Sequence, residues 1–359
     1  MKQTSLLLLL LLSMSCHAQK VFPFLDNIGY LRSFENGYSK QLDYLVPTEV
    51  KFNQNIIAFK DHKRDLFVYN GEKKYFLNNT SSRYELGLNS VTWNIGPILF
   101  HWDNGKSKIL SNFADEYLVS DSLVVFIDTR DNSLKAHYKD SVYLVTYSLE
   151  GLKLPSNIGP TTFGFKGPGE VQYIFDRGKI TEIGSSQFSF TYASGYGFSV
   201  FNDPINQSFA LYESGEIYNI EEIQIPSYKA GNNFAVYLDQ NENLMYYEDG
   251  DLKKISNYSP DFYKVKDSLV VWGETNLFFV YDGEKVSQIA NYIPEEYKIS
   301  NKTLAFRDVM GGVSVFTEGK THEVSKVYLA EFEVNGSVVR VETSKGNFLF
   351  WQNEKEFNY

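Results

Sequence analysis

The sequence predicts an all-β protein built from about ten copies of one small antiparallel sheet. Tyr, Phe and Trp make up 16% of the 359 residues, and aromatic side chains favour pleated, half-buried strands. Short apolar runs recur at intervals of roughly 35 residues, the signature of a repeat architecture. Pairs such as Asn-Gly and Asp-Gly follow these runs, and they mark tight hairpin turns. Together these observations predict a chain of similar sheets and no amphipathic helix.

The clearest copy of the repeat is the stretch Asp267–Asn291. It contains an apolar run at Ser268–Trp272, a second at Leu277–Tyr281, the turn Asp282-Gly283 and an alternating run at Glu284–Ile289. Strict alternation of apolar and polar residues indicates a strand with one wet face, whereas a continuous apolar run indicates a strand buried on both faces. Each repeat therefore begins with its most buried strand.

The same elements recur along the chain in order. The apolar first strands begin near Val21, Asn55, Ser90, Ser122, Thr161, Gly197, Asn233, Ser268, Thr303 and Ser337. Hairpin turns are predicted at Asn36-Gly37, Asn70-Gly71, Asn104-Gly105, Arg177-Gly178, Ser214-Gly215, Asp249-Gly250, Asp282-Gly283 and Glu318-Gly319. A more polar fourth strand is predicted to close the unit, at Glu49–Phe52, Tyr84–Leu88, Glu116–Val119, Phe262–Lys266, Glu296–Ser300 and Glu331–Val334.

A buried inner strand and a wet outer strand are typical of a propeller blade, so the sequence predicts a β-propeller of about ten four-stranded repeats over residues 19–359. The segment 184–197 breaks the rhythm with Ser, Gly, Phe and Tyr, and it lies near the midpoint of the ten units. Two arrangements remain open: one large ring, or two five-bladed rings divided near 184–197.

The repeat resembles β-propeller proteins in general over essentially the whole mature chain. It lacks the Gly-His and Trp-Asp pairs of WD40 repeats, the diglycine of kelch repeats, the Asp-box and the quinoprotein Trp motif. The functions of those classes therefore do not carry over. The Ala18-Gln19 junction and the Tyr-, Phe- and Asn-rich composition are similar to envelope proteins of Gram-negative bacteria.

The first eighteen residues are predicted to be a secretory signal peptide. Lys2 supplies the positive charge, Leu6–Leu12 the apolar region and Ser15–Ala18 the small-residue cleavage site. The mature chain is therefore expected in the periplasm or outside the cell. Cys16, the only cysteine, is either removed with the signal or lipidated, because the residues before it resemble a bacterial lipobox. In both cases the mature fold has no disulfide.

Acidic residues close most of the first strands: Asp26, Asp61, Asp128, Asp203, Asp239, Glu274, Asp308 and Glu342. Sharing one position of the repeat, they are expected on one face of the ring. One interpretation is an acidic rim that attracts cations or a basic partner. The favoured interpretation is structural, since Asp opens β-turns by accepting hydrogen bonds from the next backbone amides.

Aromatic residues form a second candidate site. Tyr192, Tyr196 and Phe198 lie in the irregular middle segment and are predicted to form an exposed recognition patch, since aromatics anchor interfaces. The tryptophans, in contrast, recur at blade-core positions and are expected to pack. No histidine pair has metal-ligand spacing, and the loop from Asp239 to Gly250 fails as a calcium loop because Leu244 stands where Gly is needed. No cofactor or catalytic set is predicted.

The sequence therefore favours a non-catalytic propeller that binds a protein partner in the periplasm or at the cell surface. One version is an accessory subunit of an outer-membrane secretion machine, such as the periplasmic plug of a type IX translocon. The alternative is a glycan-binding or glycan-cleaving propeller, which needs carboxylates or exposed aromatics gathered at a channel mouth. A net charge of −10 argues against nucleic acid as a partner.

Overall fold

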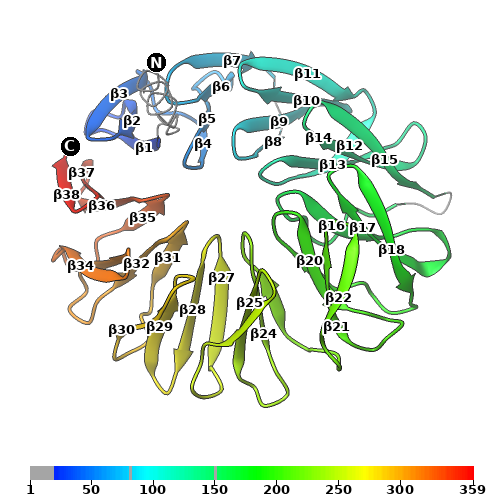
Figure 1. Ribbon diagram of the computed structural model, residues 1–359. Helices are drawn as coiled ribbons and strands as arrows, with labels where there is room; N and C mark the ends of the chain where they lie inside the picture. Colours follow the sequence, from blue (N-terminus) through cyan, green and yellow to red (C-terminus); the bar gives the residue numbers. More distant parts are fainter. Residues whose placement is uncertain (1–19, 81–82, 149–151) are drawn as a thin grey trace, which may run out of the picture.

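A computed structural model describes residues 20–80, 83–148 and 152–359 and shows a single closed ring of antiparallel sheets around a central opening (Figure 1). In the described residues there are ten sheets, here called blades 1 to 10 in chain order, and the only helical element is the short 3-10 turn η1 (Pro168–Glu170). No helix in these ranges has the length and hydropathy needed to cross a membrane. The predicted signal peptide and Cys16 lie outside the described residues.

The strands of the first five blades follow in chain order. Blade 1 consists of β1 (Phe22–Leu25), β2 (Leu31–Glu35) and β3 (Tyr38–Asp43). Blade 2 consists of β4 (Glu49–Phe52), β5 (Ile57–Lys60), β6 (Leu66–Tyr69) and β7 (Lys74–Asn78). Blade 3 consists of β8 (Arg83–Leu86), β9 (Ser90–Ile95), β10 (Ile98–Asp103) and β11 (Lys106–Ser111). Blade 4 consists of β12 (Ala114–Val119), β13 (Leu123–Asp128), β14 (Ser133–Tyr138) and β15 (Ser141–Tyr147). Blade 5 consists of β16 (Thr162–Lys166), β17 (Val171–Asp176) and β18 (Lys179–Ser185).

The second half of the ring repeats the arrangement. Blade 6 consists of β19 (Tyr192–Ser194), β20 (Phe198–Asn202), β21 (Phe209–Glu213) and β22 (Glu216–Glu221). Blade 7 consists of β23 (Tyr228–Ala230), β24 (Ala235–Leu238), β25 (Leu244–Glu248) and β26 (Asp251–Lys254). Blade 8 consists of β27 (Phe262–Lys266), β28 (Leu269–Glu274), β29 (Leu277–Tyr281) and β30 (Val286–Ala290). Blade 9 consists of β31 (Tyr297–Ser300), β32 (Thr303–Arg307), β33 (Val313–Thr317) and β34 (Lys320–Ser325). Blade 10 consists of β35 (Phe332–Asn335), β36 (Val338–Ser344), β37 (Asn347–Gln352) and β38 (Lys355–Asn358).

The predicted propeller of about ten repeats is confirmed, but the predicted grouping of the strands is wrong. The polar strand that was expected to close each unit opens the next one: β4 pairs with β5, with Val50 opposite Phe59 and Lys51 opposite Ala58. Each polar strand is thus the innermost strand, beside the central opening, as Figure 1 shows for β27 and β31. The inner strand is polar because it borders the solvent-exposed channel. The apolar strand is second and is covered by β-strands on both edges.

The hairpin turns were predicted correctly. All eight lie between the last two strands of a blade, which are the third and fourth strands except in the three-stranded blades 1 and 5. Arg177 and Gly178 both have positive φ, 49° and 96°, as a two-residue hairpin turn of the favoured twist requires. A Cβ on Gly178 would lie 2.5 Å from the ring of Tyr143 in blade 4. Glycine is therefore required there both by the backbone and by the neighbouring blade.

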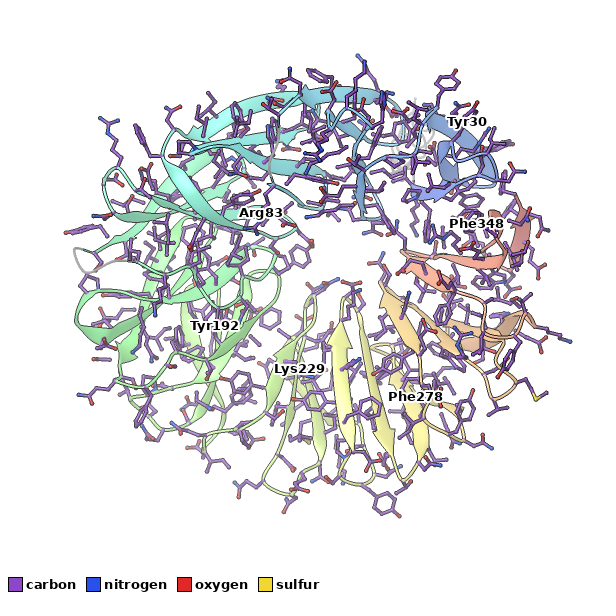
Figure 2. The ribbon with its side chains drawn as sticks, turned by 180° about the vertical axis from the view of Figure 1, so that it is seen from behind. Tyr30, Arg83, Tyr192, Lys229, Phe278 and Phe348 are labelled. Carbon is purple, nitrogen blue, oxygen red and sulfur yellow. The ribbon has the colours of Figure 1, made fainter. Side chains whose placement is uncertain are left out.

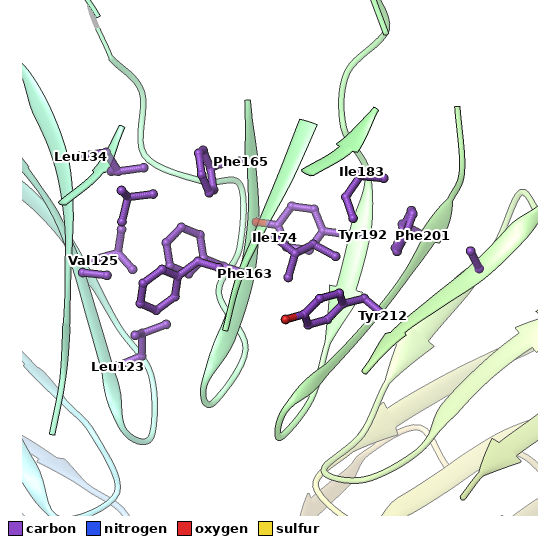
Figure 3. Close-up of a cluster of buried hydrophobic side chains, with 14 residues drawn as sticks. Leu123, Val125, Leu134, Phe163, Phe165, Ile174, Ile183, Tyr192, Phe201 and Tyr212 are labelled. Atoms are coloured by element: carbon purple, nitrogen blue, oxygen red, sulfur yellow. The ribbon is translucent and has the colours of Figure 1, made fainter. Parts of the chain in front are cut away.

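Apolar side chains pack between the faces of neighbouring blades, and one cluster runs without a break through blades 4, 5 and 6. Figure 3 shows Phe163 of β16 pointing toward Leu123 and Val125 of β13, with Phe201 and Tyr212 on the opposite side of blade 5. Tyr192 of the irregular segment 184–197 belongs to this cluster and Phe190 packs against it, so the core continues across that segment. The four tryptophans are buried, as predicted.

The ring has two distinct faces. Consecutive strands of an antiparallel blade run in opposite directions, so the turns after the first and third strands lie on one face. We call this the hairpin face, and it also carries the inner turns such as Asn53–Ile56. The turns after the second strands and the connections between blades lie on the other, the connection face. The candidate sites described below belong to one face or the other.

Candidate functional site

The inner strands place one side chain of each blade at the same register beside the channel. In blades 2, 3, 7, 8, 9 and 10 this position pairs with the second or third residue of the apolar strand and holds Lys51, Glu85, Lys229, Lys264, Lys298 and Glu333. Figure 2 shows Lys229 and Arg83 on strands that border the opening; Arg83 lies two residues before Glu85 on β8. The channel wall is therefore lined by charged side chains at a constant height.

Most of these lysines connect neighbouring inner strands. Lys51 Nζ donates to the carbonyl of Tyr84, 2.7 Å away, and forms an ion pair with Glu85 at 3.1 Å. Lys298 repeats the arrangement with the carbonyl of Phe332 at 2.8 Å and with Glu333 at 2.9 Å. Each ammonium also lies over the aromatic ring at that position of the next strand. Such contacts hold adjacent blades together near the axis.

At the hairpin face the inner turns form a narrow mouth. Their backbones are joined in a chain: Tyr196 N donates to the carbonyl of Asn232, and Asn232 N to the carbonyl of Asp267, both at 2.8 Å. Leu88 N and the carbonyl of Asp121 make the same bond on the opposite side. The turns leave a cavity of about 350 Å³ at the mouth. Backbone bonding of this kind fixes the positions of the side chains that border it.

Side chains also reach across the mouth between blades that are not neighbours. The hydroxyl of Tyr196, in blade 6, donates to the carboxylate of Asp121, in blade 4. The side-chain amide of Asn301, in blade 9, donates to Gln54 Oε1 in blade 2, and Asn301 N donates to Asp267 Oδ2 of the neighbouring blade 8 at 2.7 Å. The mouth therefore brings together two carboxyl groups, a phenol and two amides from turns spread over the whole ring. All of these groups can bind a polar ligand.

Burial raises the pKa of Asp121, and the negative charge of Asp267 raises it further, while the hydrogen bond from Tyr196 acts in the opposite direction. Burial and then the bond to the Asp121 carboxylate raise the pKa of Tyr196, so the phenol remains a donor. A carboxyl group whose neutral form is favoured, beside a second carboxyl group, is a pattern used in proton transfer. It is equally suited to binding a cation or a hydroxyl-bearing ligand.

The predicted acidic residues lie on the connection face, and their carboxylates serve the turns. Asp61 Oδ1 accepts from the backbone N–H groups of Lys63 and Asp65, and Asp308 Oδ1 from those of Met310 and Gly312. Asp26, Asp128, Asp203, Asp239 and Glu342 make equivalent contacts with the turn that follows them, whereas Glu274 accepts from Tyr258 N in the connection between blades 7 and 8. Glu274 is only 2% exposed and also accepts from Trp272 Nε1. This geometry matches the structural interpretation, not an open acidic rim.

The predicted aromatic patch is corrected by the structure. Tyr192 is 7% exposed, packs in the cluster of blades 4 to 6 and donates its hydroxyl to the carbonyl of Asn157 at 2.6 Å. Phe198 is buried between blades 6 and 7. Only Tyr196 reaches a site, and that site is the channel mouth. The misassignment arose because residues 192–194 and 198–202 are the first two strands of blade 6, where aromatic side chains face the neighbouring blades.

The mouth residues carry a signal that the sequence analysis did not use. Each described inner strand is followed by one mouth residue at a constant register, which gives Gln54, Leu88, Asp121, Tyr196, Asn232, Asp267, Asn301 and Gly336, and Pro160 holds the equivalent sequence position before β16 of blade 5. Aligning the repeats on the inner strands would have placed these positions in one ring. The diameter of the ring decides which of these residues touch across the axis, and the sequence of one repeat does not determine that diameter.

Comparison with solved structures finds matches of low similarity over most of the chain. A computationally designed protein, Ika8, has 12% identity and a TM-score of 0.35, and the match covers 93% of this chain and 99% of that chain. The CRINKLY WD40 ectodomain of the Arabidopsis thaliana receptor kinase ACR4 has 6% identity and a TM-score of 0.33, with coverage of 76% and 94%. Hsv2 of Kluyvelomyces marxianus has 10% identity and a TM-score of 0.31, with coverage of 77% and 98%.

No curated protein matches the chain. A family model described as a 10-bladed beta propeller domain, in contrast, matches residues 15–357, which is nearly the whole chain. The number of blades in that description equals the number of sheets in the described residues. This chain therefore belongs to the family of 10-bladed beta-propeller domains.

Proposed function

We propose that this propeller is a non-catalytic scaffold that binds a protein partner in the periplasm or at the cell surface. The observation that carries the proposal is a strip of exposed apolar side chains on the connection face of blades 9, 10 and 1. The strip consists of Val309, Met310, Tyr328, Leu329, Ile28, Tyr44, Leu45 and Val46. Apolar surface gathered in this way on a water-soluble fold marks an interaction site.

The strip is built from loops that pack against one another. Leu329 N donates to the carbonyl of Gly311 at 2.9 Å, and the ring of Tyr328 lies against Gly311, so the connection after blade 9 rests on the turn that holds Met310. Met310 and Tyr328 nevertheless remain 79% and 73% exposed. Their outer surfaces are available to a partner without any rearrangement of the blade.

Blade 1 supplies the other half of the strip. The rings of Tyr30 and Tyr44 meet edge to face with centroids 5.5 Å apart, and Val46 packs against Gly29. Tyr44 is 71% exposed. Blade 10 lies between the two halves: Glu342 N donates to the carbonyl of Glu331, two residues after Leu329, and Gly346 lies against Asn27. Exposed Tyr and Met side chains held on rigid turns are typical anchors of protein interfaces.

Export is supported by the predicted signal peptide at residues 1–18. A more specific form of the proposal is an accessory subunit of an outer-membrane secretion machine, such as the plug of a type IX translocon. It rests on the Ala18-Gln19 junction and on the Tyr-, Phe- and Asn-rich composition. The apolar strip would then be the surface that meets the membrane-embedded subunit.

The test is crosslinking in intact cells followed by purification from native membranes and identification of the crosslinked protein. The double variant Met310→Ser, Tyr328→Ser removes the most exposed anchors of the strip. Phe188→Ser is the matched control, because Phe188 is an equally exposed aromatic on a connection of the same face between blades 5 and 6. We expect one crosslinked partner with the native chain and the control, and its loss with the double variant. Recovery of the native chain as a free monomer would refute the proposal.

A second candidate function is glycan binding or cleavage at the channel mouth. The observation that favours it is the convergence of Asp121, Asp267 and Tyr196 at that mouth, where burial raises the pKa of the Asp121 carboxyl group. The native chain and the variants Asp121→Asn and Asp267→Asn are incubated with a panel of soluble polysaccharides, and both binding and new reducing ends are measured. Activity that disappears in both variants supports this function, and inactivity of the native chain toward the panel excludes it.

A further inference from the structure

A basic pocket lies on the channel wall of this acidic protein. It has a volume of about 350 Å³ and is bordered by the inner strands of blades 7 to 10. Four lysines line it: Lys229 of β23, Lys264 and Lys266 of β27, and Lys298 of β31. Lys264 and Lys266 are two residues apart on one strand, so their side chains leave it on the same side. The net charge of the whole chain is −10, so this concentration of positive charge is local.

Three of the four ammonium groups have no carboxylate partner among the described residues. Lys298 forms an ion pair with Glu333, the single acidic residue that lines the pocket. Lys229 donates only to the carbonyl of Tyr263, at 2.7 Å, and lies over the Tyr263 ring. Lys264 lies over the ring of Tyr297 with its Nζ 4.6 Å from the centroid. The aromatic rings orient the lysines but do not neutralise them.

The lysines repel one another. Burial lowers the pKa of Lys229, and the positive charge of Lys264 lowers it further. Removing charged groups from water without an opposite charge is unfavourable, and the penalty is larger in a concave site than on an open surface. A negatively charged group in the pocket would offset the repulsion between Lys229 and Lys264 and compensate the burial of Lys229, and the exposed Lys264 and Lys266 are free to reach it. The pocket is therefore built in the way that anion sites are built.

From these contacts we infer that the pocket formed by Lys229, Lys264 and Lys266 binds a phosphate or sulfate group. A tetrahedral oxyanion offers several acceptor oxygens and more than one negative charge, so it can accept from three separate ammonium groups at once. Lysine binds such groups as a point charge, without the fork geometry that arginine provides for a flat carboxylate. The volume admits a small charged group and part of the molecule that carries it.

The position of the pocket limits where the phosphate or sulfate group can come from. Lys266 also lines the cavity at the hairpin-face mouth, so the pocket is continuous with an opening to solvent. A free anion can enter there, and so can a phosphate or sulfate group at the end of a flexible chain. The site is separate from the apolar strip, which lies on the connection face, and it shares Lys266 with the cavity that Asp121 and Asp267 line.

The test uses the full mature chain and inorganic pyrophosphate, titrated by calorimetry at low ionic strength, with sodium chloride of equal ionic strength as the reference. We expect saturable binding of one pyrophosphate per chain. The double variant Lys264→Met, Lys266→Met should weaken it by about ten- to hundredfold, the range for losing hydrogen bonds to a charged group. Lys253→Met is the matched control, because Lys253 is exposed on the outer strand β26 of the same half of the ring, and it should bind as the native chain does.

Two further measurements separate the outcomes. Sedimentation with vesicles that carry a phosphate headgroup, against vesicles of neutral lipid, shows whether the phosphate group is taken from a membrane or only from solution. Thermal unfolding of Lys264→Met, Lys266→Met without any anion checks that the variant folds, and we expect its melting temperature to be unchanged or higher because repulsion is removed. Equal pyrophosphate affinity in the double variant and in the native chain would overturn the inference.

Discussion

Phe34 of blade 1 and Phe350 of blade 10 stack face to face, with ring centroids 4.3 Å apart and an interplanar angle of 7°. This contact closes the ring. In the described residues blade 1 has three strands and no strand is exchanged between the first and last blades, so the closure depends on side chains packed between two separate sheets. Phe22, Phe24, Phe348 and Tyr359 surround the stacked pair.

The first prediction concerns this closure. Phe350→Ala should lower the free energy of unfolding by about 3–5 kcal/mol, because Phe350 is fully buried and touches aromatic rings of both blades. Chemical denaturation measures the loss. The control is Phe76→Ala on the exposed face of β7, where a change within about 0.5 kcal/mol is expected. Equal losses in the two variants would mean that the closure contributes no more than any surface aromatic.

The second prediction concerns the hairpin glycines. Gly178 and Gly250 have similar positive φ, 96° and 86°, but only Gly178 faces a neighbouring ring. Gly250→Ala should destabilise the protein by about 1–2 kcal/mol through backbone strain alone. Gly178→Ala should be worse by a further 1–3 kcal/mol or so, because the new methyl group collides with Tyr143 in blade 4. Urea unfolding of the two variants side by side distinguishes strain from collision, and the reverse order would contradict the packing described here.

The third prediction concerns pH. His101 and His137 meet between blades 3 and 4 with ring centroids 4.6 Å apart, and Thr92 Oγ1 lies 2.9 Å from His101 Nδ1. Burial lowers the pKa of His101 to about 3, with smaller contributions from His137 and Lys108. Burial and then Lys108 lower the pKa of His137 to about 4, against a small opposing effect of Asp140.

Both histidines are neutral in the folded protein and take up protons more readily when it unfolds. The unfolded state therefore binds more protons between pH 6.5 and the folded pKa values, and stability falls as the pH drops through that window. His137→Leu should make the fall between pH 6.5 and 4 shallower. Denaturation midpoints at several pH values measure the slope, with His62→Leu at the exposed turn of blade 2 as the control. An unchanged slope in His137→Leu would contradict the prediction.

Much of the fold could be predicted because each blade is specified locally. Alternating residues around pairs such as Ser214-Gly215 determine a hairpin without reference to the rest of the chain. The turn Asn353-Glu354 escaped notice because it has no glycine, although both residues have positive φ. The predicted phase of the repeat was wrong for a different reason: β4 lies between β3 and β5 in sequence, and only hydrogen bonding decides that it pairs with β5 and not with β3.

The site was harder to predict than the fold because it depends on distances between turns in different blades. Asp121 and Tyr196 are 75 residues apart in the sequence. They belong to blades 4 and 6, which are separated by blade 5, yet their side chains meet at the channel mouth. The aromatic content of segment 184–197 suggested exposure, but Tyr192 and Phe198 belong to the pattern of strands that face other blades. Tyr196, between them, occupies a turn position and differs from them only by register.

The last prediction tests the electrostatics of that mouth. Because the pKa of Asp121 is raised in the folded protein, the folded state binds more protons than the unfolded state at and above pH 3.8, up to the folded pKa. Stability is therefore lost as the pH rises through this window, and the ionised carboxylate remains unfavourable at neutral pH.

Asp121→Asn removes the charge and keeps an oxygen that can accept from the Tyr196 hydroxyl. We expect this variant to unfold at a higher temperature than the native chain at pH 7, with the difference disappearing below pH 3.8. Asp251→Asn, exposed on β26, is the control and should show no difference at either pH. A lower melting temperature for Asp121→Asn at pH 7 would contradict this prediction. It would mean that hydrogen bonds to the ionised carboxylate stabilise the folded protein by more than burial and the charge of Asp267 destabilise it.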